Sequence, residues 1–138
     1  MEEGDLLIQL DANEGELNLG VAQANYDRNS ALLASVKTEA ELASNLSAQY
    51  LQLNEIAESK QSRAVDLHSR DMISDAQLDE ARLETSQANI SLQQHLAQVA
   101  DFPNKIAQQQ ASVAESATYF KRAKLDLQQT QIRAPFSG

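Results

Sequence analysis

The stretch Ser62–Ala81, "SRAVDLHSRDMISDAQLDEA", decides how this chain folds. A long helical pattern runs into it and a second one runs out of it, and the residues between them include neither Gly nor Pro. Ser74 and Gln77 have the spacing of a capping box, and Ile73 and Leu78 have the spacing of the matching hydrophobic staple. The stretch therefore predicts a short turn followed by the start of a second helix.

The helical pattern after the turn repeats every seven residues. One position of the repeat is mostly large and apolar, and the position three residues later is mostly small or polar. The first series is Leu78, Thr85, Leu92, Val99, Ile106, Val113, Phe120 and Leu127, and the second is Ala81, Ala88, His95, Phe102, Gln109, Ser116 and Ala123. This spacing is typical of a coiled-coil seam, the stripe that one helix presents to another.

The pattern before the turn is less regular but of the same kind. Ala22, Val36, Ala43, Tyr50, Ala57 and Ala64 share one heptad position. We assign Leu32, Leu46, Leu53 and Leu67 to the second seam position, with Asn29, Glu39 and Lys60 as imperfections. Two apolar stripes joined by a short turn, at about residues 68–73, must fold back on each other. The sequence predicts an all-α fold, a long antiparallel two-helix coiled-coil hairpin over residues 13–131.

Short strand-like segments bracket the hairpin. "GDLLIQLD", at residues 4–11, alternates apolar and polar residues, which indicates a strand. "TQIRAPFSG", at residues 130–138, leads through Ile132 into an Ala134-Pro135 break and a Ser137-Gly138 turn. We therefore expect a short β-strand at each end.

Pro103 interrupts the second helical pattern, because proline removes a backbone donor and crowds the preceding turn. Folding about the central turn places Pro103 opposite Thr38, which opens the capping-box pattern "TEAE". We expect kinks near residues 36–39 and 100–104, at the same height of the two helices.

Composition and motifs exclude several classes of function. The net charge of -9, from 20 acidic and 11 basic residues without a basic cluster, argues against nucleic-acid binding. No apolar run reaches the length of a membrane span, and no signal peptide is visible. The opening "MEEGDLLIQLD" reads as the middle of a longer sequence, with Met1 as a start codon added to a fragment. We expect no enzyme, because no nucleophile–base pair, phosphate loop or zinc-protease motif occurs. We also expect no cofactor and no metal, although Asp66, His68 and Asp71 gather near the turn.

Three residues around the turn carry a further signal. Arg63, Leu67 and Ser74 have the spacing R-x3-L-x6-S at the tip of the predicted hairpin. Without a partner, Ser74 would be a helix cap, Leu67 the last core leucine, and Arg63 a solvated charge able to pair with Asp66. Their spacing resembles the tip motif of periplasmic adaptor subunits, the membrane fusion proteins of the HlyD/AcrA type in tripartite efflux pumps. "GDLLIQLD" and "LDLQQTQIRAPFSG" resemble the edges of that family's split lipoyl-like domain, so the resemblance spans nearly the whole chain.

The resemblance implies an arrangement in three parts. Residues 1–12 would end the first lipoyl-like half, residues 13–131 would form the hairpin, and residues 132–138 would start the second half. In the full-length, inner-membrane-anchored protein, usually six adaptors stand side by side in the periplasm. Their tips, here Arg63, Leu67 and Ser74, meet a TolC-type outer-membrane channel, and parts absent from this sequence hold an inner-membrane transporter, most often of the RND class. An adaptor for type I protein secretion or for a major-facilitator pump, or a generic coiled-coil tether, remains an alternative.

A second apolar stripe runs off the seam of the second helix. Leu83, Ile90 and Leu125 repeat by heptads, together with Ala97 and Ala111. Scattered exposed apolar residues are common on protein surfaces, whereas a continuous stripe usually marks a contact. We therefore name Leu83, Ile90 and Leu125 as a candidate face for packing between neighbouring adaptors.

Overall fold

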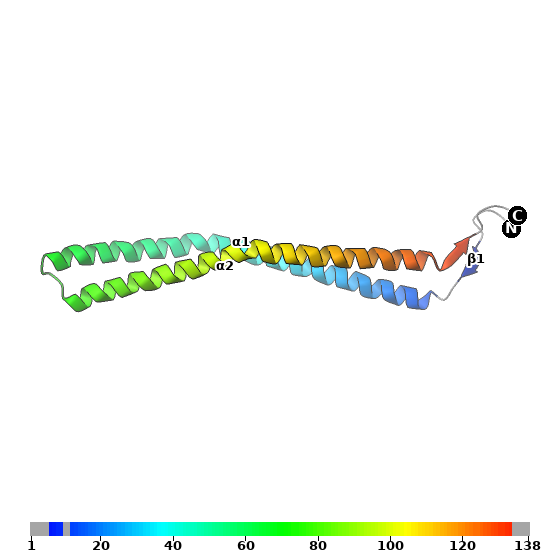
Figure 1. Cartoon of the computed structure of the whole chain (residues 1–138), viewed down its shortest axis with the longest axis horizontal. Coiled ribbons are helices and arrows are strands. Elements are labelled where there is room, and N and C mark those ends of the chain that lie inside the picture. Colours follow the sequence, from blue (N-terminus) through cyan, green and yellow to red (C-terminus); the bar gives the residue numbers. More distant parts are fainter. Residues whose placement is uncertain (1–5, 10–11, 134–138) are drawn as a thin grey trace. The chain divides into compact units, whose positions relative to one another are not determined.

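The structure is a computed structural model that describes residues 6–9 and 12–133. The element order is β1 (Leu6–Gln9), α1 (Asn13–Ser69), α2 (Asp75–Gln128) and β2 (Gln131–Arg133). Helices α1 and α2 run antiparallel and pack against each other, which confirms the helical hairpin (Figure 1). No helix among the described residues is long and apolar enough to cross a membrane.

The two short strands pair with each other at the ends of the described chain. β1 and β2 are antiparallel, with Ile8 opposite Ile132 and Gln9 opposite Gln131. The Ala134-Pro135 break and the Ser137-Gly138 turn predicted from the sequence lie outside the described residues. The origin of the strands in a lipoyl-like domain stays a prediction.

The chain forms two compact units. Unit 1 comprises residues 1–35 and 105–138, and unit 2 comprises residues 36–104. In unit 1, Ala22 and Ser116 are buried between the helices, and the rings of Tyr26 and Phe120 stack with their centroids 6.2 Å apart.

In unit 2, buried seam residues come from both helices. They are Asn54 and Ala57 of α1 and Leu78, Leu92, His95 and Phe102 of α2. The ring of His95 stacks on that of Tyr50 with a centroid distance of 4.4 Å. Its Nε2–H donates to the Ala43 carbonyl at 2.8 Å and lies 3.0 Å from Ser47 Oγ.

Helix α2 follows the predicted heptads throughout. Every residue of the two series from Leu78 to Leu127 is buried or half-buried. The helix also continues through Pro103, which is exposed. The boundaries between the two units fall after Ser35 and after Asn104. The kinks near residues 36–39 and 100–104 stay predictions.

In helix α1, the structure corrects the second seam position that was predicted from the sequence. Leu32, Leu46 and Leu53 are exposed, and only Leu67 of the assigned series is half-buried. The covered series lies one residue later and consists of Leu33, Ala40, Ser47, Asn54, Gln61 and His68. Apart from Leu33, these residues are smaller or more polar than leucine. They alternate with Ala43, Tyr50 and Ala57 at spacings of three and four, which keeps both positions facing α2. The assignment was wrong because it followed the largest apolar side chains.

Candidate functional site

The central turn is built by a helix C-cap that contains no glycine. Met72 N–H donates to the Leu67 carbonyl at 2.9 Å, and Asp71 N–H donates to the His68 carbonyl at 3.0 Å. These two bonds form a Schellman motif, in which the residue after the helix adopts a left-handed conformation. Asp71 fills that position with φ of 56°. Sequence reasoning missed this cap, because the usual glycine signal is absent and Asp is only tolerated there.

The start of α2 has the predicted capping box. Gln77 N–H donates to Ser74 Oγ at 3.2 Å, and Ser74 N–H donates to Gln77 Oε1 at 3.0 Å. Ile73 is half-buried and Leu78 is buried, as a hydrophobic staple requires. Ser74 is exposed but both its backbone and its hydroxyl are engaged in the cap. Its local role is therefore to fix where α2 begins.

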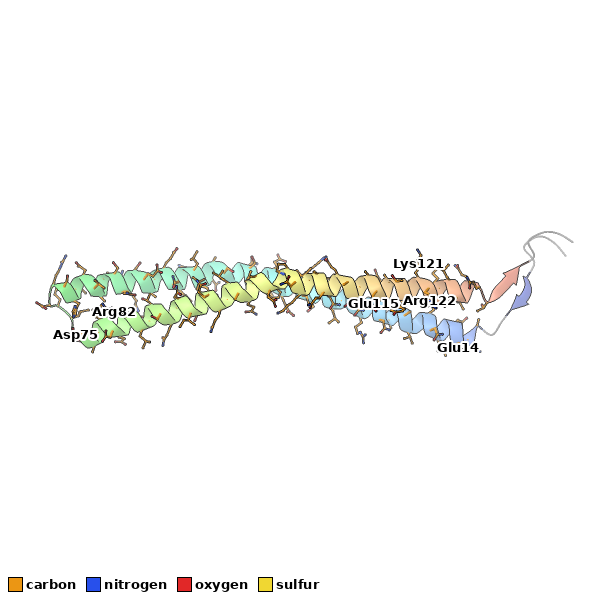
Figure 2. All side chains as sticks on the ribbon, viewed as in Figure 1. Glu14, Asp75, Arg82, Glu115, Lys121 and Arg122 are labelled. Carbon is orange, nitrogen blue, oxygen red and sulfur yellow. The ribbon has the colours of Figure 1, made fainter. Side chains whose placement is uncertain are left out.

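Several charged and polar side chains at the tip have partners within the chain. Asp66 pairs with Arg70 at 3.3 Å, and His68 Nε2 bonds Asp75 Oδ1 across the turn. Figure 2 shows Asp75 in the first turn of α2 and Arg82 farther along that helix. The pairing considered between Arg63 and Asp66 does not form, because Arg70, one turn later, binds Asp66. No group of three metal-ligating side chains occurs in the part of the chain that the structure describes.

Arg63 is the charged member of the three predicted tip residues. It is exposed, and no ion pair to it exists within residues 12–133. A shallow surface groove formed by Gln52, Glu55, Ile56 and Ser59 ends at Arg63. Leu67, one turn further, is half-buried, and its carbonyl anchors the C-cap. The tip thus presents a cation beside a partly covered leucine, on a turn that Ser74 and Gln77 fix.

The candidate packing face is exposed along α2. Leu83 is 58%, Ile90 56% and Leu125 48% exposed, and Ala97 and Ala111 are exposed as well. This stripe lies on the side of α2 opposite the seam, because each member falls two residues after a residue of the second seam series. Its geometry allows a contact outside the hairpin.

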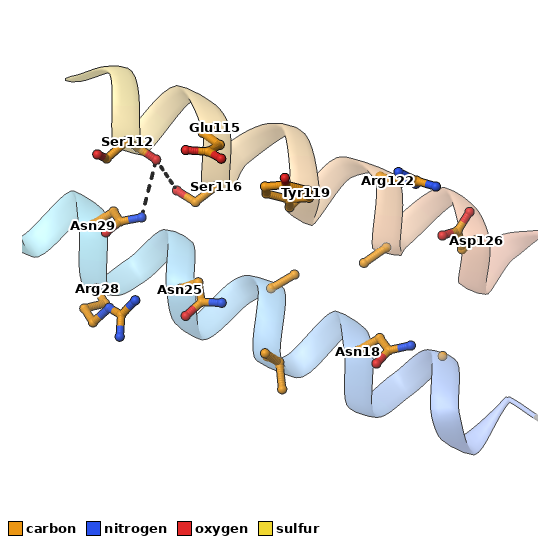
Figure 3. Close-up of a pocket in the computed structure, with 14 residues that line it drawn as sticks. Asn18, Asn25, Arg28, Asn29, Ser112, Glu115, Ser116, Tyr119, Arg122 and Asp126 are labelled. Atoms are coloured by element: carbon orange, nitrogen blue, oxygen red, sulfur yellow. Dashed lines mark hydrogen bonds between the residues drawn. The ribbon is translucent and has the colours of Figure 1, made fainter. Parts of the chain in front are cut away.

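Unit 1 contains a groove that sequence reasoning did not anticipate (Figure 3). It has a volume of about 550 Å³ and lies between the helices where small residues, including Gly15, Ala22 and Ala123, line the seam. Asn29 Nδ2 donates to the Ser112 carbonyl at 3.3 Å at one end. Basic and acidic side chains, Arg122 and Asp126 among them, mix on its rim, so its charge favours no class of ligand.

No protein-family model matches the chain, and no curated protein matches it.

Proposed function

We propose that this hairpin belongs to a periplasmic adaptor that links an inner-membrane transporter to a TolC-type outer-membrane channel in tripartite efflux. The observation that carries the proposal is the tip. The R-x3-L-x6-S residues stand on a rigid turn between two long helices, with Arg63 exposed and without an intramolecular ion pair in the described chain. A surface cation that no neighbour neutralises can pair with a carboxylate or a helix C-terminus of a partner.

Each tip residue has a distinct part in this proposal. Arg63 provides the charged contact to the channel, and Leu67 provides the apolar contact beside it while its carbonyl holds the turn. Ser74 acts through the backbone, because its hydroxyl caps α2 and so sets the direction of the turn. The docking surface is therefore assigned to Arg63 and Leu67, and Ser74 is a positioning residue.

The remainder of the proposal follows from the resemblance and is supported by the ends of the hairpin. β1 and β2 pair where the two halves of a split lipoyl-like domain would meet. The full-length protein would be anchored in the inner membrane, face the periplasm and assemble as a hexamer. Its transporter, of the RND class by preference, would bind parts outside this sequence. Leu83, Ile90 and Leu125 would lie between neighbouring adaptors. We propose no catalysis, cofactor or nucleic-acid partner.

Two other functions are compatible with a long hairpin. An adaptor of a type I protein secretion system would use the same tip and the same channel class, and the cargo would distinguish it. A generic coiled-coil tether would need heptads alone. The paired strands β1 and β2 favour an adaptor over a tether, because a simple rod would need no strands at its end.

The test replaces Arg63→Asp and Leu67→Ser together in the full-length protein. We expect export to fall and cross-linking of the tip to the channel to be lost, while the adaptor stays folded and abundant. Arg122→Asp is the matched control, since it reverses an exposed charge in unit 1 rather than at the tip. Export and cross-linking that persist in the double variant would refute the docking role.

A further inference from the structure

Asp71 is an exposed carboxylate that has no bonding partner in the part of the chain that the structure describes. It lies at the apex, the segment of residues 70–74 between α1 and α2. The two nearest acids differ from it, because Asp66 and Asp75 are each bound to a basic side chain of the turn. The Asp71 carboxylate is therefore available to a second molecule.

The local structure of the turn does not favour an aspartate at position 71. Asp71 has φ of 56°, a left-handed conformation that glycine adopts without the clash of a Cβ. Aspartate is tolerated there chiefly when its side chain hydrogen-bonds the nearby backbone, and the Asp71 carboxylate makes no such bond among the described residues. The position also follows the C-terminal end of α1, where the helix dipole disfavours a negative charge. Folding alone does not account for this carboxylate, and residues held in such conformations cluster at functional sites.

The residue after Asp71 gives the apex an exposed apolar side chain. Met72 is 66% exposed, the highest value among the large apolar side chains of unit 2. Its N–H is bound to the Leu67 carbonyl, so the helix cap holds the backbone on which both side chains stand. A thioether adapts its shape to an apolar surface, and a charge pair that is covered from water is stronger than an exposed one. The apex thus combines a free carboxylate with an apolar neighbour that a docked partner would cover.

We infer that Asp71 is a specificity-determining residue of the tip, and that its carboxylate binds a basic side chain of the channel. Carboxylates accept charge-assisted hydrogen bonds from lysine and arginine, which are stronger than hydrogen bonds between neutral groups. This contact rests on the proposed function, because the channel that Arg63 and Leu67 meet is the molecule that Asp71 binds.

The position of Asp71 relative to Arg63 explains how the contact gives specificity. Arg63 lies six residues before the last residue of α1, which places it about 9 Å from that end of the helix. Asp71 lies beyond the end of α1 and carries the opposite charge. Two contacts of opposite sign at different heights match a channel surface in one orientation and repel it in others.

The test measures binding of the purified full-length protein to a purified TolC-type channel of the same organism in lipid nanodiscs, at low and at high salt. Asp71→Asn and Asp71→Gly both remove the carboxylate, and both residues suit the left-handed conformation. We expect each variant to bind about fivefold more weakly at low salt, mainly through slower association, and the difference to shrink at high salt. Thermal unfolding should show no loss of stability in either variant, which separates a contact with the channel from a role in the fold.

Glu80→Gln is the matched control. Glu80 is also exposed and without a bonding partner in the described chain, and its replacement changes the net charge by the same amount as Asp71→Asn. It lies five residues after the first residue of α2, away from the apex. We expect Glu80→Gln to bind the channel as the unsubstituted protein does.

Three results would overturn the inference. The first is an Asp71→Asn variant that binds as tightly as the unsubstituted protein at both salt concentrations. The second is an equal loss in Glu80→Gln, which would mean that net charge acts at a distance. The third is a lower Tm that accompanies the weaker binding, which would assign Asp71 to the fold.

The Arg63→Asp and Leu67→Ser double variant, measured in the same assay, separates this inference from the docking role. If the double variant loses binding while Asp71→Asn keeps it, docking stands and only the Asp71 contact fails. If the unsubstituted protein does not bind the channel at all, the docking function fails and the Asp71 contact fails with it.

Discussion

The position of the seam on α1 can be tested by replacing leucine with alanine at a buried site and, separately, at an exposed site. Leu92 of α2 is 6% exposed between the helices of unit 2, and Leu53 of α1 is 59% exposed in the same unit. Replacing Leu92 by Ala removes buried methyl groups and leaves a cavity, which costs about 2–3 kcal/mol at the lower end of the range for core leucines. Leu53→Ala removes mainly surface that water already reaches and introduces the better helix former, so its cost stays below about 1 kcal/mol.

These costs translate into a measurable difference in Tm. With the usual unfolding entropy per residue, 1 kcal/mol corresponds to roughly 3 °C for a chain of this size. We therefore expect Leu92→Ala to lower Tm by about 7–10 °C and Leu53→Ala by less than about 3 °C. Thermal unfolding of the isolated chain followed by far-UV circular dichroism measures both values.

The measurement also separates folding from association. A Leu53→Ala effect that grows with protein concentration belongs to contacts between copies, because only association depends on concentration. If Leu53→Ala lowers Tm as much as Leu92→Ala at every concentration, Leu53 packs inside the hairpin. The corrected seam would then be refuted.

Two further predictions concern the turn. Ser74→Ala removes the acceptor of Gln77 N–H and should lower the free energy of unfolding, measured by urea denaturation, by about 1 kcal/mol. Ser74→Asp keeps an acceptor at the cap and should retain most of that free energy. An unchanged urea midpoint for Ser74→Ala would mean that the cap contributes nothing to stability. Asp71→Gly should raise the free energy of unfolding by about 1 kcal/mol, because glycine adopts the left-handed conformation at φ of 56° without the clash of a Cβ; a loss of stability would show that the Asp71 side chain supports the turn.

The sequence predicted the turn and α2 well because their signals are local or strongly periodic. Ser74 and Gln77 satisfy each other within one turn of helix, so the capping box depends on no distant contact. Along α2, large residues such as Leu78 and Leu92 recur every seven residues on the side that faces α1. Both features can be read without knowing what lies opposite.

The α1 seam was harder because its contacts are made by small and polar side chains. Asn54 and Ala57 are buried, while Leu53 and Ile56, one residue before each of them, are exposed. A seam assigned from hydrophobicity alone follows the leucines, and it is therefore placed one residue too early in α1. The better signal is complementarity, because a helix that presents Leu92 and Phe102 leaves room opposite for alanine, serine and asparagine.

The polar residues of the seam have a consequence for the tip. His95 donates to the Ala43 carbonyl at 2.8 Å, and Thr85 donates to the Ala57 carbonyl at 3.0 Å, so each binds a specific residue of the other helix. A slip of one helix along the other would leave the buried His95 Nε2–H unpaired, at a cost of about 1–3 kcal/mol. The half-buried Thr85 hydroxyl would keep its second acceptor, the Ala81 carbonyl of its own helix. A seam of leucines alone would resist such a slip less, because apolar contacts re-form at the next heptad. The polar seam thus fixes the height of α1 against α2 in unit 2. That height sets how the two helix ends meet at the turn.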